Sequence, residues 1–407
     1  KQERKREETI MTYQELKRDE ERYVMATYGR FPVALDHGEG AKLWDVEGKC
    51  YIDMTSGIGV NCLGYSDSDL IKAISDQAAK LMHVSNLYTT APMVETAKTL
   101  VLHSGLEGGK VFFANSGAEA NEGAIKLARK YSYDKYGEGR SKIVTLKNSF
   151  HGRTVTTLKA TGQDKFHQFF FPFTEGFDYA EAGNLEDVKA KADGTACAVM
   201  MELIQGEGGV LPLEKEFVQA VEAFCREKDL LLIIDEVQTG IGRTGSLFCF
   251  QQYGIRPDVV TLAKALGGGL PVGAVLAAGS CSGVLTPGTH ATTFGGSPTV
   301  CAAANAVLEK VTNPVFLEKV RSKGEYLRQK LLAMNSPAIL GVRGMGLMVG
   351  IIAEDGKQGE YVNQLMDHGV LALTAGKNAV RLLPPLTITI EEIDEALAAM
   401  KEVFGAE

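Results

Sequence analysis

The chain has 407 residues, of which 45% are hydrophobic and 23% are charged, and its formal net charge is −8. This composition is typical of a globular protein, and the length predicts two or three domains or one large domain with a smaller one attached. The acidic balance argues against nucleic acid as a principal partner.

Membrane and metal sites are not expected. The apolar runs are interrupted well before the roughly 18 residues that a membrane span requires. Residues 1–22 are strongly charged and show no apolar signal segment, and residues 1–10 precede the first methionine, so they read as a leader or an added segment. The seven cysteines form no CxxC pair and the seven histidines no HxxxH or HExxH motif. We therefore expect a cytoplasmic protein with reduced thiols.

The N-terminal part is predicted to contain a charged helix over residues 12–28 and a β-hairpin over 41–54 with its turn at Glu47 and Gly48. A glycine-rich loop over 56–64 and a helix over 70–82 follow. The loop has no clear period, which is typical of a segment close to a functional site.

The middle of the chain alternates between strands and helices. The expected strands are 111–114, 143–146, 198–203, 230–234, 259–263 and 274–278, and the expected helices are 118–131 and 214–227. Because these strands are continuously apolar, they indicate a mainly parallel sheet with helices on both faces.

The character changes after Asn313 and Pro314, where we expect a helix over 315–334, strands over 346–353 and 380–383, and a last helix over 391–404. This predicts an N-terminal segment (1–64) packed with a C-terminal small α+β domain (313–407), and a large domain (65–312) between them.

Lys264 is the first candidate for chemistry, because it ends the apolar strand 259–263 and three glycines follow at 267–269. Desolvation disfavours an ammonium at such a place and lowers its pKa from about 10.4. A partly neutral lysine can attack a carbonyl and form a Schiff base. For an isolated lysine an ordinary surface position is more common, so the neighbouring motifs decide.

Asp235 follows another apolar strand and therefore needs a cationic or donor partner. A pyridinium N–H group would serve, and Gln238 could then reach a ring substituent. A helix cap or an ordinary salt bridge is an equally open alternative.

Ser116 stands between a strand and a helix, with Glu119 three residues later as a predicted capping box. The first-turn N–H groups of such a helix form an anion site suited to phosphate. Simple helix capping is the commoner explanation for this motif alone.

Two further motifs carry side chains that could contact a ligand. Phe150 offers a flat face for a ring, and Arg153 a fork for a carboxylate, although a lone phenylalanine is more often part of a core. The loop that begins with Thr292 and Thr293 is rich in hydroxyl groups, as in loops that cap a phosphate. Together, the four motifs and Lys264 supply what a pyridoxal phosphate enzyme requires.

At these positions the sequence resembles the class III aminotransferases, which are fold type I pyridoxal phosphate enzymes. The resemblance runs from about residue 28 to 386, and within the family it is strongest to the acetylornithine type. The motifs that carry it are residues 85–89, 115–121, 150–154, 204–210, 235–238, 264–269 and 374–376 ahead of Arg381. It implies a mainly parallel seven-stranded sheet flanked by helices in a large domain that binds pyridoxal phosphate.

The resemblance also implies roles in binding this cofactor. Lys264 would carry the Schiff base and move the substrate proton, Asp235 would keep the pyridine nitrogen protonated, and Phe150 would stack on the ring. Gln238 would reach the ring hydroxyl. The other cofactor-binding residues would be Ser116, Gly117, Ala118, Val237 and Thr293. Thr293 would reach the phosphate of a neighbouring subunit, which implies a homodimer with shared active sites.

The implied reaction converts N-acetylornithine and 2-oxoglutarate into N-acetylglutamate semialdehyde and glutamate, in arginine biosynthesis. Arg153 would hold the acetylornithine α-carboxylate and the glutamate side-chain carboxylate, and Arg381 the glutamate α-carboxylate. Glu207 would pair with Arg381 when the amine donor enters, and Thr292 would touch the substrate. A domain-bridging salt bridge is the alternative role for Arg381 and Glu207.

Some positions depart from the family pattern. Residues 64–67 read Gly-Tyr-Ser-Asp where Gly-His-x-His-Pro is common, Leu203 replaces a usual proline, and Ser297 a usual asparagine. Thr292, where serine is frequent, leaves the acyl group open. Ornithine, succinylornithine, succinyldiaminopimelate and 4-aminobutyrate aminotransferases remain alternatives, as do an aminomutase and a non-catalytic pyridoxal phosphate-binding protein.

Overall fold

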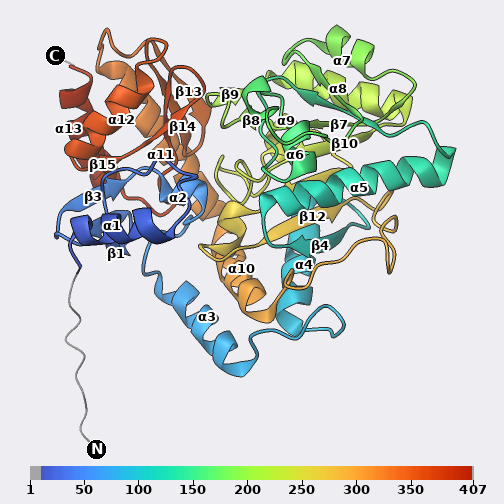
Figure 1. Ribbon diagram of the computed structural model, residues 1–407, viewed down its shortest axis with the longest axis horizontal. Coiled ribbons are helices and arrows are strands. Elements are labelled where there is room, and N and C mark those ends of the chain that lie inside the picture. Colours follow the sequence, from blue (N-terminus) through green and yellow to red (C-terminus); the bar gives the residue numbers. More distant parts are fainter. Residues whose placement is uncertain (1–10, 406–407) are drawn as a thin grey trace, which may run out of the picture.

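A seven-stranded sheet lies at the centre of the protein, whose computed structural model describes residues 11–405 (Figure 1). In sheet order its strands are β4 (Lys110–Ala114), β12 (Gly273–Ala277), β11 (Val259–Leu262), β10 (Leu231–Asp235), β7 (Ala196–Met201), β5 (Lys142–Leu146) and β6 (Phe177–Ala180). The expected seven-stranded sheet is confirmed, and β6 had not been predicted.

The sheet is mainly parallel, as expected, with one exception. β12 pairs antiparallel with both β4 and β11, while the remaining pairs are parallel. The cause is the short connection between these strands, because β11 ends at Leu262 and β12 begins at Gly273. A parallel return needs a crossover of about a dozen residues or more, so this chain turns back on itself.

Both faces of the sheet are buried, which explains the continuous apolar runs of its strands. Ile233 belongs to a core cluster with helix α5 (Gly117–Tyr136) on one face, and the adjacent Ile234 to a cluster with α8 (Lys215–Lys228) on the other. The other helices of this region are α3 (Ser68–Lys80), α4 (Ala91–Ser104), α6 (Val155–Ala160), α7 (Leu185–Lys191), α9 (Phe250–Tyr253) and α10 (Pro298–Val311), with short 3₁₀ turns η1 (Asp164–Phe166) and η2 (Lys264–Gly267).

The N-terminal hairpin pairs with a strand of the C-terminal part of the chain. β3 (Cys50–Asp53) pairs with β15 (Val370–Leu371), in a sheet completed by β1 (Leu35–Glu39) and β2 (Lys42–Asp45). The neighbouring elements are β13 (Gly341–Met345), β14 (Met348–Ile352), β16 (Leu373–Ala375), β17 (Ala379–Leu382), α11 (Pro314–Ala333), α12 (Gln358–Asp367) and α13 (Ile390–Val403). The remaining elements are α1 (Tyr13–Tyr23), α2 (Ser56–Gly59), β8 (Ile204–Gln205) and β9 (Leu211–Pro212).

Several predicted bounds are wrong. The first helix ends at Tyr23 rather than at residue 28, the helix after Ser116 continues to Tyr136, and the loop over 56–64 begins with the helical turn α2. The domain boundaries at 64/65 and 312/313 stay predictions, and the leader assigned to residues 1–10 lies outside the described residues. Between residues 11 and 405, no helix is long and apolar enough to cross a lipid bilayer.

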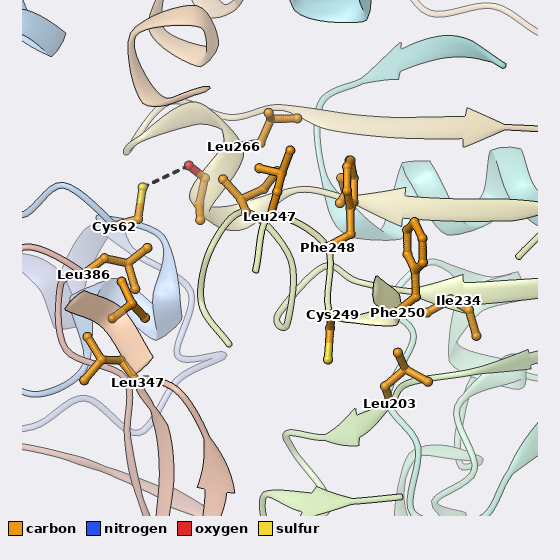
Figure 2. Packing of buried hydrophobic residues seen from close by; sticks show 14 of the residues in the cluster. Cys62, Leu203, Ile234, Leu247, Phe248, Cys249, Phe250, Leu266, Leu347 and Leu386 are labelled. Carbon is orange, nitrogen blue, oxygen red and sulfur yellow. Dashed lines mark hydrogen bonds between the residues drawn. The ribbon is translucent and has the colours of Figure 1, made fainter. Parts of the chain in front are cut away.

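A continuous apolar core joins the large sheet to the C-terminal elements. Figure 2 shows it running from Ile234 and Phe250 to Leu347 and Leu386. The buried guanidinium of Arg243 crosses the same junction, since its Nη1 donates a hydrogen bond to the Leu347 carbonyl oxygen at 2.9 Å. This packing fixes β17 with respect to the strand ends of the large sheet.

Candidate active site

A cavity of about 570 Å³ lies at the strand ends of the large sheet, within the usual size of a ligand site. Most of the residues predicted to bind the cofactor line it, although they come from four separate segments of the chain. The predicted residues in its wall are Ser116, Gly117, Ala118, Phe150, Arg153, Asp235, Val237, Gln238 and Lys264.

Asp235 ends β10, and only 4% of its surface is exposed. Its Oδ2 lies 2.8 Å from both Asn121 Nδ2 and His151 Nδ1, and its Oδ1 accepts the Val237 N–H group at 3.0 Å. These three contacts fix the orientation of a carboxylate that also lines the cavity. A cationic ring N–H group there would give the buried charge its counter-ion.

Asn121 and His151 were not predicted to have roles, although both lie inside the predicted motifs. Asn121 is buried on α5 and lines the cavity, and its side chain also donates to the His151 carbonyl oxygen at 2.7 Å. The signal that could have identified them is a buried carboxylate needing donors, combined with polar residues on the inner face of an adjacent helix.

Lys264 begins the turn η2 directly after β11, with a left-handed φ of 39°. Such a conformation is uncommon outside glycine and is often found at functional sites. Burial lowers the pKa of Lys264 to about 8, and the nearby Glu207 partly opposes this shift. Because Asp235 pairs with Thr261 of the adjacent β11, the two predicted catalytic residues reach one cavity from neighbouring strands.

The N-terminus of α5 forms one wall of the cavity. Ser116 is its N-cap, and its Oγ accepts the Glu119 N–H group at 3.2 Å. The predicted capping box is only half right, because the Glu119 carboxylate accepts the N–H group of Asn115 instead of that of Ser116. A Cβ atom on Gly117 would lie 2.7 Å from Val237 Cγ1, so this close approach requires glycine. The first-turn N–H groups, which lack intrahelical partners, are suited to an anion.

Glu202 follows β7 and lines the same cavity, although no role was predicted for it. Its Oε2 accepts the Phe150 N–H group at 2.9 Å, which anchors the segment carrying Phe150 and Arg153. Burial, together with the charge of Asp235, raises the pKa of Glu202 well above its usual value. The sequence did contain a signal for Glu202, because it is an acidic residue at the end of an apolar strand, like Asp235.

Arg381 on β17 is 2% exposed and contacts the predicted partner Glu207. Its Nη1 lies 2.6 Å from Glu207 Oε1 and 3.0 Å from Gln238 Oε1. Burial by itself would raise the pKa of Glu207, but the charge and hydrogen bond of Arg381 outweigh it and hold the pKa below its usual value. Gln238 lines the cavity and so connects this ion pair to it.

Thr292 and Thr293 lie apart from the cavity wall formed by the described residues. Thr292 is half-buried, and its Oγ1 accepts a hydrogen bond from Asn115 Nδ2 at 3.2 Å. Thr293 is exposed. Thr293 is therefore not part of the cavity wall of its own chain.

The site fits pyridoxal phosphate on chemical grounds. A helix N-terminus suits its phosphate, the face of Phe150 its ring, the Asp235 carboxylate its ring nitrogen, and a lysine with a lowered pKa its aldehyde. All of these groups line a single cavity.

Comparison with known proteins places these observations in a family. The model of the class III aminotransferases matches residues 23–404. The acetylornithine aminotransferase of Haemophilus ducreyi is 50% identical over 97% of this chain and 100% of its own length. That of Caldanaerobacter subterraneus subsp. tengcongensis is 50% identical over 95% of this chain and 98% of its own length.

Solved structures agree. The N-acetylornithine aminotransferase of Stenotrophomonas maltophilia matches with a TM-score of 0.82 at 36% identity, over 95% of this chain and 98% of that one. The ornithine aminotransferase of Toxoplasma gondii, with pyridoxal phosphate at partial occupancy in its active site, matches with a TM-score of 0.92 at 30% identity, over 97% of this chain and 95% of that one. The chain therefore belongs to the class III aminotransferases.

Proposed function

We propose that the protein transfers the side-chain amino group of N-acetylornithine to 2-oxoglutarate, in arginine biosynthesis, and that it uses pyridoxal phosphate. The products are N-acetylglutamate semialdehyde and glutamate. The observation that carries the proposal is the meeting of Lys264 and Asp235 in one cavity beside the ion pair of Arg381 and Glu207. The 50% identity to acetylornithine aminotransferases supports this donor over the other donors of the family.

Pyridoxal phosphate, when bound, supplies an electron-withdrawing ring that spreads the charge of a substrate carbanion. Asp235 would hold a proton at the ring nitrogen, which would favour the transition state more than the bound substrate. Lys264 would hold the cofactor through its aldehyde, and its amine would move the substrate proton as general acid and base. Ser116, Gly117 and Ala118 would hold the phosphate at the α5 N-terminus.

Arg153 binds the α-carboxylate of acetylornithine and the side-chain carboxylate of glutamate. Glu207 occupies Arg381 while the acetylornithine amine reacts, because that amine has no carboxylate beside it. The glutamate α-carboxylate then takes the place of Glu207. This alternation avoids leaving a buried guanidinium without a counter-ion, which would be costly.

A panel of amino donors tests the proposed function. N-acetylornithine, succinylornithine, ornithine and 4-aminobutyrate are each offered with 2-oxoglutarate, and glutamate formation is measured. We expect kcat/KM to be highest for N-acetylornithine and at least about tenfold lower for ornithine, because desolvation of its free ammonium is costly. Conversion of a donor without 2-oxoglutarate would instead indicate an aminomutase, and glutamate formation from none of the donors would refute the proposal.

The lowered pKa of Lys264 predicts a pH dependence of cofactor attachment. Below pH 8 the amine is mainly protonated and unreactive, and above pH 8 it is mainly neutral. The rate at which apoprotein develops a visible, borohydride-sensitive absorption band should therefore rise about tenfold from pH 7 to pH 9.

Lys264→Ala should develop no such band, and Lys80→Ala, at the exposed end of α3, should behave like the parent protein. A rate that keeps rising toward pH 10.5, as for an ordinary lysine, would contradict the lowered pKa.

Glu207→Gln should separate the two half-reactions. Without its carboxylate partner Arg381 binds glutamate more readily, so the KM for glutamate should fall. The acetylornithine half-reaction should slow by about tenfold to a hundredfold, the usual effect of losing a charged hydrogen-bond partner. Single-turnover measurements with each donor test this, with Glu216→Gln on the exposed face of α8 as control. Equal losses in both half-reactions would indicate a purely structural salt bridge.

The active site is proposed to be shared in a homodimer, in which Thr293 reaches the phosphate bound by a second copy. Its exposure outside the cavity of its own chain supports this role. The seven free cysteines support a reducing compartment such as the cytoplasm.

Sedimentation should give the mass of a dimer, and Thr293→Ala should weaken cofactor binding about tenfold by losing a hydrogen bond to an anion. A monomer with full cofactor affinity would exclude the shared site.

A further inference from the structure

Arg153 and Arg381 are held in different ways. Arg381 is buried and paired with Glu207. Arg153 is exposed, and across residues 11–405 its guanidinium makes no hydrogen bond or ion pair within the protein. Instead its Cζ atom lies 4.2 Å from the ring centroid of Phe166 and 5.6 Å from that of Phe150. The guanidinium thus rests on aromatic faces.

Phe166 ends the short turn η1, and hydrogen bonds attach this turn to the segment before Phe150. The Phe166 N–H group donates to the Gln163 carbonyl oxygen at 3.0 Å, and Gln163 Nε2 donates to the Ser149 carbonyl oxygen at 2.9 Å. The rings of Phe150 and Phe166 pack edge to face, with centroids 5.9 Å apart and planes at 68°. Phe166 is therefore fixed with respect to the cavity wall that contains Phe150.

An aromatic ring attracts a guanidinium without occupying its N–H donors. The whole fork of Arg153 stays available for two parallel hydrogen bonds to a carboxylate. A guanidinium already held against a ring also loses less freedom when the carboxylate binds. A carboxylate partner, as at Arg381, would instead have to be displaced.

We propose that Phe166 is a positioning residue, which holds the Arg153 guanidinium against its ring so that it is ready for a substrate carboxylate. The inference rests on the proposed function, in which Arg153 binds that carboxylate. Phe166 itself touches no reacting atom, so it should affect substrate affinity and leave the chemical step unchanged.

The experiment uses the pyridoxal phosphate-loaded protein and glutarate, a five-carbon dicarboxylate, as the probe. Phe166→Leu, which keeps an apolar side chain but lacks the ring, should weaken glutarate binding about three- to tenfold by calorimetry. It should raise the KM for 2-oxoglutarate by a similar factor, with kcat within about twofold. Phe166→Tyr, which keeps the ring, should restore both values.

Phe169→Leu is the matched control, since this residue is in the same segment but 84% exposed, with its ring packed on Phe170. It should leave glutarate affinity unchanged. The visible absorption band and the melting temperature should be the same in all variants, so a folding defect would be recognised.

A double-mutant cycle with Arg153→Ala decides between positioning and a general structural role. In the Arg153→Ala background, Phe166→Leu should have no further effect on glutarate binding. An equal loss in both backgrounds, or no loss in either, would overturn the inference. If Arg153→Ala itself leaves glutarate binding unchanged, the role proposed for Arg153 fails as well, whereas the donor panel tests transamination independently.

Discussion

The structure of the site depends on a carboxylate that is buried at the end of a central strand. Asp235 loses its hydration there, and a buried charge is stable only with donors and a counter-ion. Asn121, His151 and the Val237 N–H group provide the donors, and they come from three different segments. The counter-ion is left to whatever enters the cavity. This constraint favours a ligand with a cationic ring nitrogen over a neutral one.

The pKa values of the ionisable groups near Asp235 are shifted by burial and by neighbouring charges. Glu202 lines the same cavity, and burial together with the charge of Asp235 raises its pKa, which disfavours a second negative charge beside Asp235. Burial lowers the pKa of Lys264 to about 8, so its ammonium form is less favoured beside Asp235 than that of an exposed lysine would be. Glu207 stays ionised because Arg381 is its partner. Burial thus favours a higher pKa at both glutamates, and contact with an arginine reverses the net shift at Glu207 alone.

Local sequence patterns predicted the strand ends at Lys264 and Asp235, because apolar runs of strand length are bounded by polar residues. They could not predict the direction of β12, which depends on the length of a connection in three dimensions. The roles of Asn121, which contacts Asp235, and of Glu202, which contacts Phe150, were not predicted, since these contacts join segments far apart in the sequence. Glu119 illustrates the same limit over a short range, because its carboxylate accepts a hydrogen bond from the N–H group of Asn115 and not from that of Ser116, as had been expected.

The two arginines show how one site can treat two substrates differently. A carboxylate that binds at Arg381 must displace Glu207, so only a substrate with a carboxylate beside its reacting carbon recovers that cost. A carboxylate at Arg153 would have no carboxylate of the described residues to displace, because the guanidinium lies against the rings of Phe150 and Phe166. In the proposed reaction, both substrates would use the second interaction and only one would use the first. Discrimination between them would then depend on the state of Glu207, while Arg153 would provide the affinity that they share.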